Sequence, residues 1–265
     1  MTFVRHYLLA LQFFTRIPVT GRLAQWVGYS PAMLRASAAH FPGVGWLVGL
    51  TVAAVTYTLM LYLPASGFTA LVAAVLGTAL SVWLTGAFHE DGLADVADGL
   101  GGSPQRERAL LIMKDSRVGA FGVLAVVLML LAKVSLLALM GSVDATVLCL
   151  AVFAAHVVSR ALPLVLIRTL RHVGDDETSK SKPLADQISL SGLAVALLWT
   201  AAALAAVNWL DGGLNLLLPT AAATLAMVWM GRLFWRRLQG FTGDCLGATQ
   251  QVCEVVFYLV LALTL

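Results

Sequence analysis

Apolar residues run along most of this chain in long blocks that are separated by short polar stretches. A helix needs about 20 apolar residues to cross the hydrocarbon core of a bilayer, so each block predicts a membrane-spanning helix. The predicted spans lie at residues 43–63, 66–88, 118–141, 145–168, 190–210, 213–231 and 247–265. We therefore expect an all-α fold, a polytopic helical membrane protein with about seven transmembrane helices in one bundle.

The N-terminal 41 residues are less apolar than the blocks that follow. They contain the arginines Arg5, Arg16, Arg22 and Arg35. A short apolar run from Tyr7 to Phe14 ends before Pro18, and proline disfavours helical conformation in the residue before it. No small-residue cleavage site follows this run, so it does not resemble a signal peptide. We expect an interfacial N-terminal helix, and a single integral-membrane domain over residues 1–265 because no polar linker separates two.

Composition narrows the class of protein. The 265-residue chain is 60% hydrophobic and 12% charged, with a mean hydropathy of +0.87. These values exclude an ordinary soluble domain. The net charge of +3 is too small to indicate nucleic-acid binding, so we expect no nucleic-acid partner. The cysteines Cys149, Cys245 and Cys253 lack the spacing of a disulfide framework or a zinc site.

The basic residues predict how the chain is oriented. Fifteen of the 17 lysines and arginines lie before the first span or in the segments 89–117, 168–189 and 232–246. The remaining loops, near Pro64, Gly141 and Asp211, contain none. By the positive-inside rule, the basic side faces the cytoplasm. We therefore expect the loops 89–117 and 232–246 to be cytoplasmic and the C-terminus to lie on the other side.

The residues after the second predicted span carry most of the candidate chemistry. From Glu90 to Asp98 there are four acids in nine residues. If residues 90–100 are helical, Asp91, Asp95 and Asp98 lie within an arc of about 60° on one helix face. Carboxylate oxygens grouped in this way suit a hard divalent cation, Mg²⁺ first, usually shared with substrate phosphates. The alternative is an acidic helix face that is only solvated.

Two further motifs lie on the same predicted side. One comprises Lys114, Asp115 and Arg117, followed by glycines at the start of a helix, where cations and free N–H groups favour phosphate. The other places Thr242 and Asp244 just before the last span. Either of these two residues could instead be the N-cap of that helix.

Two basic residues fall inside predicted spans, where charge is costly and marks a site or a partner. Arg160 lies near His156 and Ser159, and this cluster either contacts substrate or forms a structural ion pair. Lys133 is interpreted as structural. The polar loop 172–187 is interpreted as solvated rather than as a lid over the site.

Several of these motifs resemble the cobalamin synthase family. They are His89-Glu-Asp-Gly-Leu-Ala-Asp-x-x-Asp-Gly, Met113-Lys-Asp-Ser-Arg-Val-Gly-x-x-Gly and Thr242-Gly-Asp-x-Leu-Gly-Ala. The early stretches Gln12-Phe-Phe-Thr-Arg-Ile-Pro and Phe41-Pro-x-Val-Gly are also similar to that family. The resemblance runs from end to end, and its specificity lies in residues 86–122 and 240–249.

The resemblance implies a Mg²⁺-dependent transferase of the cell inner (plasma) membrane that acts in cobalamin biosynthesis. A hydroxyl of α-ribazole, or of α-ribazole 5′-phosphate, would attack the cobinamide-linked phosphorus of adenosylcobinamide-GDP. GMP would leave, and adenosylcobalamin or its 5′-phosphate would form. These small molecules and membrane lipid are the implied partners, and the oligomeric state is left open, a homo-oligomer included.

Displacing a nucleoside monophosphate from a diphosphate needs a metal and cations around the developing charge, which assigns roles to the candidate residues. The expected metal ligands are Asp91, Asp95, Asp98, Asp115 and Asp244. The expected catalytic residues are His89, as a base near the attacking hydroxyl, with Asp91, Asp95 and Asp244. The expected substrate-binding residues are Lys114 and Arg117 on the diphosphate, together with Ser159, Arg160 and Thr242.

Two other functions are weighed against this one. CDP-alcohol phosphotransferases, which form lipids, resemble the pattern D-G-x-x-A-R followed by G-x-x-x-D-x-x-x-D. Here Asp91-Gly92 is followed by Asp95-Val96 without the arginine, and the second half is missing. A small-molecule transporter would place its substrate near the membrane midplane, often between internal repeats. This chain shows no such repeat, and its polar motifs lie at one predicted membrane edge.

Overall fold

The computed structural model of this chain describes residues 2–174 and 188–265. The helices are α1 (Thr2–Phe14), α2 (Gly21–Val27), α3 (Pro31–Ser37), the short 3-10 helix η1 (Ala38–His40), α4 (Phe41–Tyr62), α5 (Thr69–Thr85), α6 (Phe88–Gly102), α7 (Arg106–Met113), α8 (Ala120–Val143), α9 (Ala145–Ala161), α10 (Pro163–Thr169), α12 (Leu190–Leu210), α13 (Leu217–Leu238) and α14 (Gly243–Leu263). Within the described ranges, the only β-type pairing is an isolated bridge between His172 and Phe241.

The predicted all-α membrane fold is confirmed. Six of the described helices are long and apolar enough to cross a membrane, and there are seven if the bent pair α5–α6 forms one span. The predicted span 190–210 coincides with α12, and 43–63 lies within a residue or two of α4. The broad apolar surface of these helices explains the agreement, because hydropathy alone locates segments that face lipid.

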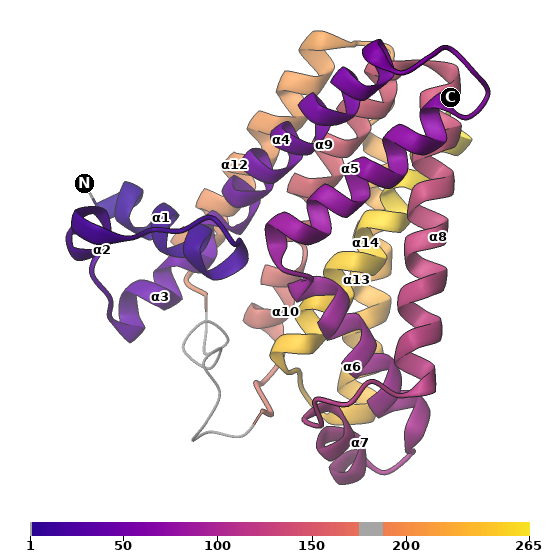
Figure 1. Cartoon of the computed structure of the whole chain (residues 1–265). Helices are drawn as coiled ribbons and strands as arrows, with labels where there is room; N and C mark the ends of the chain where they lie inside the picture. Colours follow the sequence, from indigo (N-terminus) through magenta and orange to yellow (C-terminus); the bar gives the residue numbers. More distant parts are fainter. Residues whose placement is uncertain (1, 175–187) are drawn as a thin grey trace.

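Helix α9 lies at the centre of the bundle. Together with α10 it forms the most buried of the candidate spans, whereas α8 is the least buried. Helix α4 packs closely against α9 through Gly45 and Gly49, where an added Cβ would meet the backbone of His156 and Phe153. Small residues four positions apart allow two membrane helices to approach in this way. The helices α1, α2 and α3 lie beside the bundle, against one flank (Figure 1).

The second predicted span, 66–88, differs from the structure. Helix α5 ends at Thr85, and the axis turns by 88° before α6 begins. Gly86 and Ala87 both adopt the left-handed region, with φ of 66° and 59°. This conformation ends the helix, and the two N–H groups donate to the carbonyls of Trp83 and Val82 in its last turn. The acidic segment therefore forms a separate helix, α6, which confirms the expected helix over residues 90–100.

The turns between the helices lie at two opposite ends of the bundle. The turns near Pro64, Asp144 and Asp211 and the C-terminus lie at one end, while α7 and the turn between α13 and α14 lie at the other (Figure 1). Most of loop 172–187 lies outside the described residues, so its interpretation as solvated stays a prediction. Its first residues are held beside α14, because Val173 and Arg171 exchange backbone hydrogen bonds with Phe241.

Candidate functional site

The site is built on the crossing of α6 and α14. Gly92 of α6 lies so close to α14 that an added Cβ would be 2.8 Å from the carbonyl oxygen of Asp244. On the opposite side of the contact, a Cβ at Gly247 would lie 3.3 Å from the backbone of His89. Two glycines thus allow the backbones to touch, and this brings the motif at 89–99 against the motif at 242–248.

The crossing brings together three acids, Asp91, Asp95 and Asp244. The carboxylate of Asp95 is within electrostatic reach of Asp91 and Asp98 on its own helix and of Asp244 on α14. Asp244 also interacts with Asp91. Asp91 is exposed, and Asp95 and Asp244 are half-buried. Because like charges repel at this range, a cation near these carboxylates would relieve the repulsion.

Thr242 orients one of these acids. It occupies the N-cap position of α14, but its hydroxyl accepts no hydrogen bond from the helix backbone. Instead it donates to the carboxylate of Asp244 at 3.2 Å. The alternative that Thr242 is the N-cap residue is therefore confirmed for its position, although its side chain does not bond to the helix backbone, and Asp244 lies within the first turn.

Asp98 is engaged in a different contact. Its side chain is buried, and its two oxygens accept hydrogen bonds from the backbone N–H groups of Gly119, at 2.7 Å, and Gly122, at 2.8 Å. These amides are among the free donors at the start of α8. Asp98 therefore ties α6 to the N-terminus of α8.

Asp115 is paired with a neighbouring arginine. The Arg117 guanidinium binds it through two nitrogens, with a shortest distance of 2.6 Å, and these hydrogen bonds lower the pKa of that carboxyl to about 2. In the part of the chain that the structure describes, no three His, Cys, Asp or Glu side chains are close enough to hold a metal ion. The acids with no such backbone or arginine partner are Asp91, Asp95 and Asp244, and their hard oxygens fit Mg²⁺.

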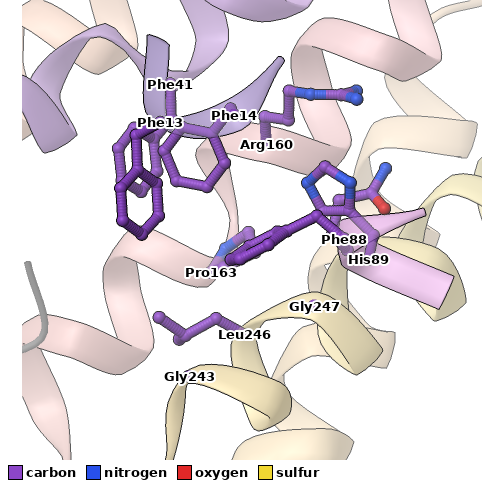
Figure 2. Close-up of a pocket in the computed structure, with 11 residues that line it drawn as sticks. Phe13, Phe14, Phe41, Phe88, His89, Arg160, Pro163, Gly243, Leu246 and Gly247 are labelled. Carbon is purple, nitrogen blue, oxygen red and sulfur yellow. The ribbon is translucent and has the colours of Figure 1, made fainter. Parts of the chain in front are cut away.

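A cavity of about 40 Å³ opens beside the crossing. Phenylalanines from α1, α4 and α6 form one wall: Phe13, Phe14, Phe41 and Phe88. His89, Arg160 and Gln250 supply the polar lining, and the ring of His89 stacks at 6.2 Å from that of Phe14 (Figure 2). The other lining residues include Gly243 and Gly247, so the aromatic pocket adjoins the acids of the crossing.

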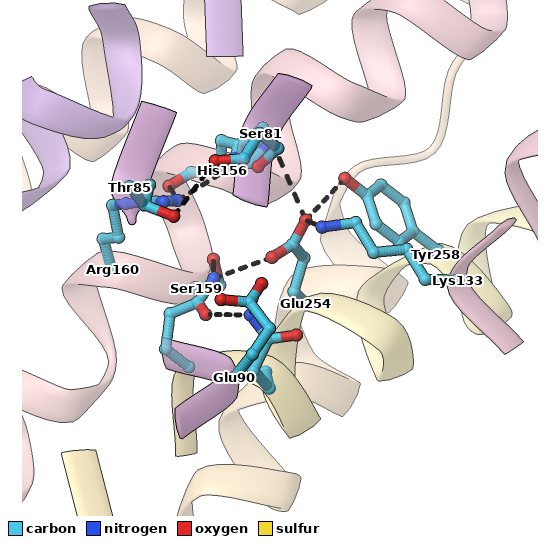
Figure 3. Close-up of polar contacts among 11 residues, drawn as sticks. Ser81, Thr85, Glu90, Lys133, His156, Ser159, Arg160, Glu254 and Tyr258 are labelled. Atoms are coloured by element: carbon cyan, nitrogen blue, oxygen red, sulfur yellow. Dashed lines mark hydrogen bonds and ion pairs between the residues drawn. The ribbon is translucent and has the colours of Figure 1, made fainter. Parts of the chain in front are cut away.

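A buried polar network lies deeper in the bundle, with Glu254 of α14 at its centre (Figure 3). Lys133 Nζ approaches Glu254 Oε1 to 2.7 Å, and both side chains are almost fully buried. This is a close ion pair, although its geometry is not that of an aligned hydrogen bond. Tyr258 donates to the same oxygen at 3.0 Å. The interpretation of Lys133 as structural fits this placement.

The network extends from Glu254 toward the acidic helix. Gln250 donates to Glu254 at 2.7 Å and to Ser159 at 2.9 Å. Gln251 donates to Glu90 at 3.0 Å and to the oxygen of Gln250 at 2.9 Å. Ser159, expected to bind substrate, is thus buried against Gln250 and lies outside the residues that line the aromatic pocket.

Arg160, like Gln250, belongs to the polar lining of the pocket. Its Nη1 contacts His156 Nδ1 at 2.8 Å and donates to the carbonyl of His156 at 3.0 Å. Within the described ranges no carboxylate oxygen lies within 4 Å of its guanidinium, and its buried Nε has no hydrogen-bond partner. A buried arginine in an apolar bundle is costly unless it is paired, and Nε is left unpaired in a residue that lines the pocket.

The structure brings the predicted site residues together only in part. Asp91, Asp95 and Asp244 lie within electrostatic reach of one another, and His89 lines the pocket that Gly243 and Gly247 of α14 also line. Lys114 and Arg117 are exposed at the end of α7 and in the segment after it. Sequence reasoning missed Glu254 and the phenylalanine wall, although an acid inside an apolar span is a signal in its own right.

Fold and site together define a polytopic helical membrane protein with a carboxylate-rich site where two of its helices cross. The sequence profile of the cobalamin-5-phosphate synthase family matches residues 6–262. The chain therefore belongs to the cobalamin-5-phosphate synthase family.

Three similar proteins share a name. A protein of Albidiferax ferrireducens named adenosylcobinamide-GDP ribazoletransferase is 64% identical over 99% of both chains. Its namesake in Polaromonas naphthalenivorans is 61% identical over the full length of both. A namesake in Vibrio cholerae is 42% identical over 96% of this chain and 92% of its own. No solved structure matches the chain.

The contacts of Asp98 generate a stability prediction. Asp98→Asn keeps one acceptor oxygen but turns an NH₂ group toward a backbone N–H, so we expect a loss of about 2 kcal/mol in the free energy of unfolding. Thermal unfolding in detergent measures it. Asp91→Asn, an exposed acid on the same helix, is the control and should leave the unfolding temperature unchanged. Equal unfolding temperatures for the two variants would contradict the anchoring role of Asp98.

The Lys133–Glu254 pair generates a second stability prediction. Lys133→Met or Glu254→Gln alone leaves one buried charge uncompensated, and each should destabilise the protein by about 3 kcal/mol or more. The double variant removes both charges and should recover part of that loss. Arg236→Met, on the exposed face of α13, is the matched control. Additive losses in the double variant would show that the two charges do not stabilise each other.

Proposed function

We propose that this member of the family joins α-ribazole, or its 5′-phosphate, to adenosylcobinamide-GDP with release of GMP. The observation that carries the proposal is the crossing of α6 and α14, which brings Asp244 within electrostatic reach of Asp91 and Asp95. Transfer between a diphosphate and a hydroxyl depends on positioning and on stabilising charge rather than on covalent work by the protein. The names of the relatives support the same reaction.

Mg²⁺ would be held by Asp91, Asp95 and Asp244. When bound, the ion would neutralise charge on the phosphate oxygens. Asp98 and Asp115, which were expected in the same cradle, are better explained as an anchor for α8 and as the partner of Arg117. Thr242 would hold Asp244 in its orientation through the hydrogen bond that it donates.

The other site residues would act on the organic substrates. Lys114 and Arg117, which follow α7, would bind the diphosphate of the GDP-linked substrate. The planar guanidinium of Arg117 suits two phosphate oxygens at once. His89 would accept the proton of the attacking hydroxyl. It lies on the wall of the aromatic pocket.

The test is turnover by the purified protein in detergent. Adenosylcobinamide-GDP, α-ribazole and Mg²⁺ should yield GMP and a completed corrinoid in equal amounts, without any ion gradient. The α-ribazole 5′-phosphate form is assayed in parallel to determine which nucleoside is preferred. Binding of these compounds with no release of GMP would contradict transfer and favour a transporter.

Two variants should distinguish the role of Asp95 in metal binding from the role of Arg117 in diphosphate binding. Asp95→Asn keeps the size of the side chain but removes a charge from the cradle, so kcat should fall by roughly 100-fold or more. Arg117→Lys keeps the charge but loses the planar fork. Its effect should appear mainly in the KM for the GDP-linked substrate. The measurement is kcat and KM against Mg²⁺ concentration, and wild-type kinetics for Asp95→Asn would rule out the metal role.

We also propose that the protein, acting as a single domain, lies in the cell inner membrane with its site on the cytoplasmic side. The basic residues gather at the end of the bundle that carries the site. Reporters fused near Arg236 should therefore report cytoplasm, and fusions near Asp144 and Asp211 should report the opposite side. A cytoplasmic signal at Asp144 would contradict this orientation.

A further inference from the structure

We propose that the aromatic pocket binds the flat base of the incoming nucleoside, with Arg160 donating a hydrogen bond to an acceptor nitrogen on the edge of that base. The aromatic pocket is the cavity lined by Phe13, Phe14, Phe41 and Phe88 with His89, Arg160 and Gln250. The inference rests on the proposed function, because the nucleoside is its second substrate. It adds where that substrate is held and what recognises it.

The wall of the pocket suits a planar aromatic group. Phe14 makes edge-to-face contacts with Phe13, at 4.8 Å, and with Phe41, at 4.0 Å. The ring of Phe88 also packs edge-to-face against that of Phe14, with 5.5 Å between their centroids. Phe88 is 37% exposed, so it lies where the pocket opens to the surface. A heteroaromatic ring stacks on such faces and edges more favourably than an alkyl chain does.

The polar lining of the pocket disfavours a purely apolar ligand. Arg160 is 4% exposed, and its Nε is a buried donor without a partner among the described residues. A lipid chain would leave this donor unsatisfied, at the full desolvation penalty. A base with one unprotonated ring nitrogen supplies the missing acceptor. Ligand sites of this kind combine apolar walls with a few convergent polar groups.

The position of the pocket fits the transfer. Gly243, which lines it, precedes Asp244, whose backbone contacts Gly92 at the crossing of α6 and α14. His89, which also lines it, packs its backbone against Gly247 of α14. A base held in the pocket would therefore place its ribose beside His89 and the start of α14, where Gly243 precedes Asp244. The cavity has room for roughly three water molecules, so a bicyclic base requires Phe88 to move outward at the mouth.

The test compares two nucleosides that differ in one atom. One is α-ribazole, and the other is its indole analogue, in which a C–H group replaces the acceptor nitrogen. Their dissociation constants are measured by calorimetry without the GDP-linked substrate, and their KM values are measured under turnover. The wild-type protein should prefer α-ribazole by at least about tenfold, since a hydrogen bond from a charged donor contributes that much.

Three variants assign the preference to residues. Arg160→Leu should bind the two nucleosides equally, while Arg160→Gln, which keeps a donor, should retain part of the preference. Phe13→Leu should weaken both nucleosides and leave their ratio unchanged. Phe68→Leu, an exposed phenylalanine before α5, is the matched control and should change neither.

The outcomes separate this inference from the proposed function. Turnover of α-ribazole with no preference over the indole analogue would overturn the inference and leave the transferase standing. A preference that survives Arg160→Leu, in protein that unfolds at the wild-type temperature, would overturn the assignment to Arg160. Absence of turnover with either nucleoside would overturn the proposed function itself.

Discussion

The close crossing of α6 and α14 is the contact on which the site depends. Gly92 and Gly247 leave no room for side chains between the two backbones, and only this approach brings Asp244 beside Asp91 and Asp95. The sharp turn at Gly86 and Ala87 makes the crossing possible, because it directs α6 away from the axis of α5. A span that continued straight through residue 88 would carry the acids away from α14.

The buried network explains why an apolar bundle contains charges at all. Lys133 and Glu254 form one pair between α8 and α14, and Gln250 and Gln251 join that pair to Ser159 and Glu90. Such contacts hold α6, α8, α9 and α14 in a fixed arrangement, since an unpaired polar group in this environment is costly. Arg160 is left with an unused donor toward the aromatic pocket. The same network that stabilises the bundle thus supplies Arg160 and Gln250 to the lining of the pocket.

Much of the fold was predictable from the sequence, because hydropathy reports directly on which segments can face lipid. The acidic helix was predictable as well, since its three acids repeat with helical spacing. The turn before it was not, because Ala87 adopts the left-handed conformation, which residues with a side chain other than Asn or Asp rarely adopt. Nor could spacing distinguish Asp98 from Asp95. Both lie on the same face of α6, and only the position of the first turn of α8 makes Asp98 an anchor.

Direct observation of a bound metal tests the central proposal, that Asp91, Asp95 and Asp244 at the crossing of α6 and α14 would hold a divalent ion. Mn²⁺ is a hard cation that replaces Mg²⁺ in oxygen sites, and its binding to the purified protein is counted by electron paramagnetic resonance. The account predicts one tightly bound ion per chain, lost when the three acids are changed to asparagine and retained in Asp115→Asn. Equal Mn²⁺ binding by the triple variant and the wild-type protein would contradict it.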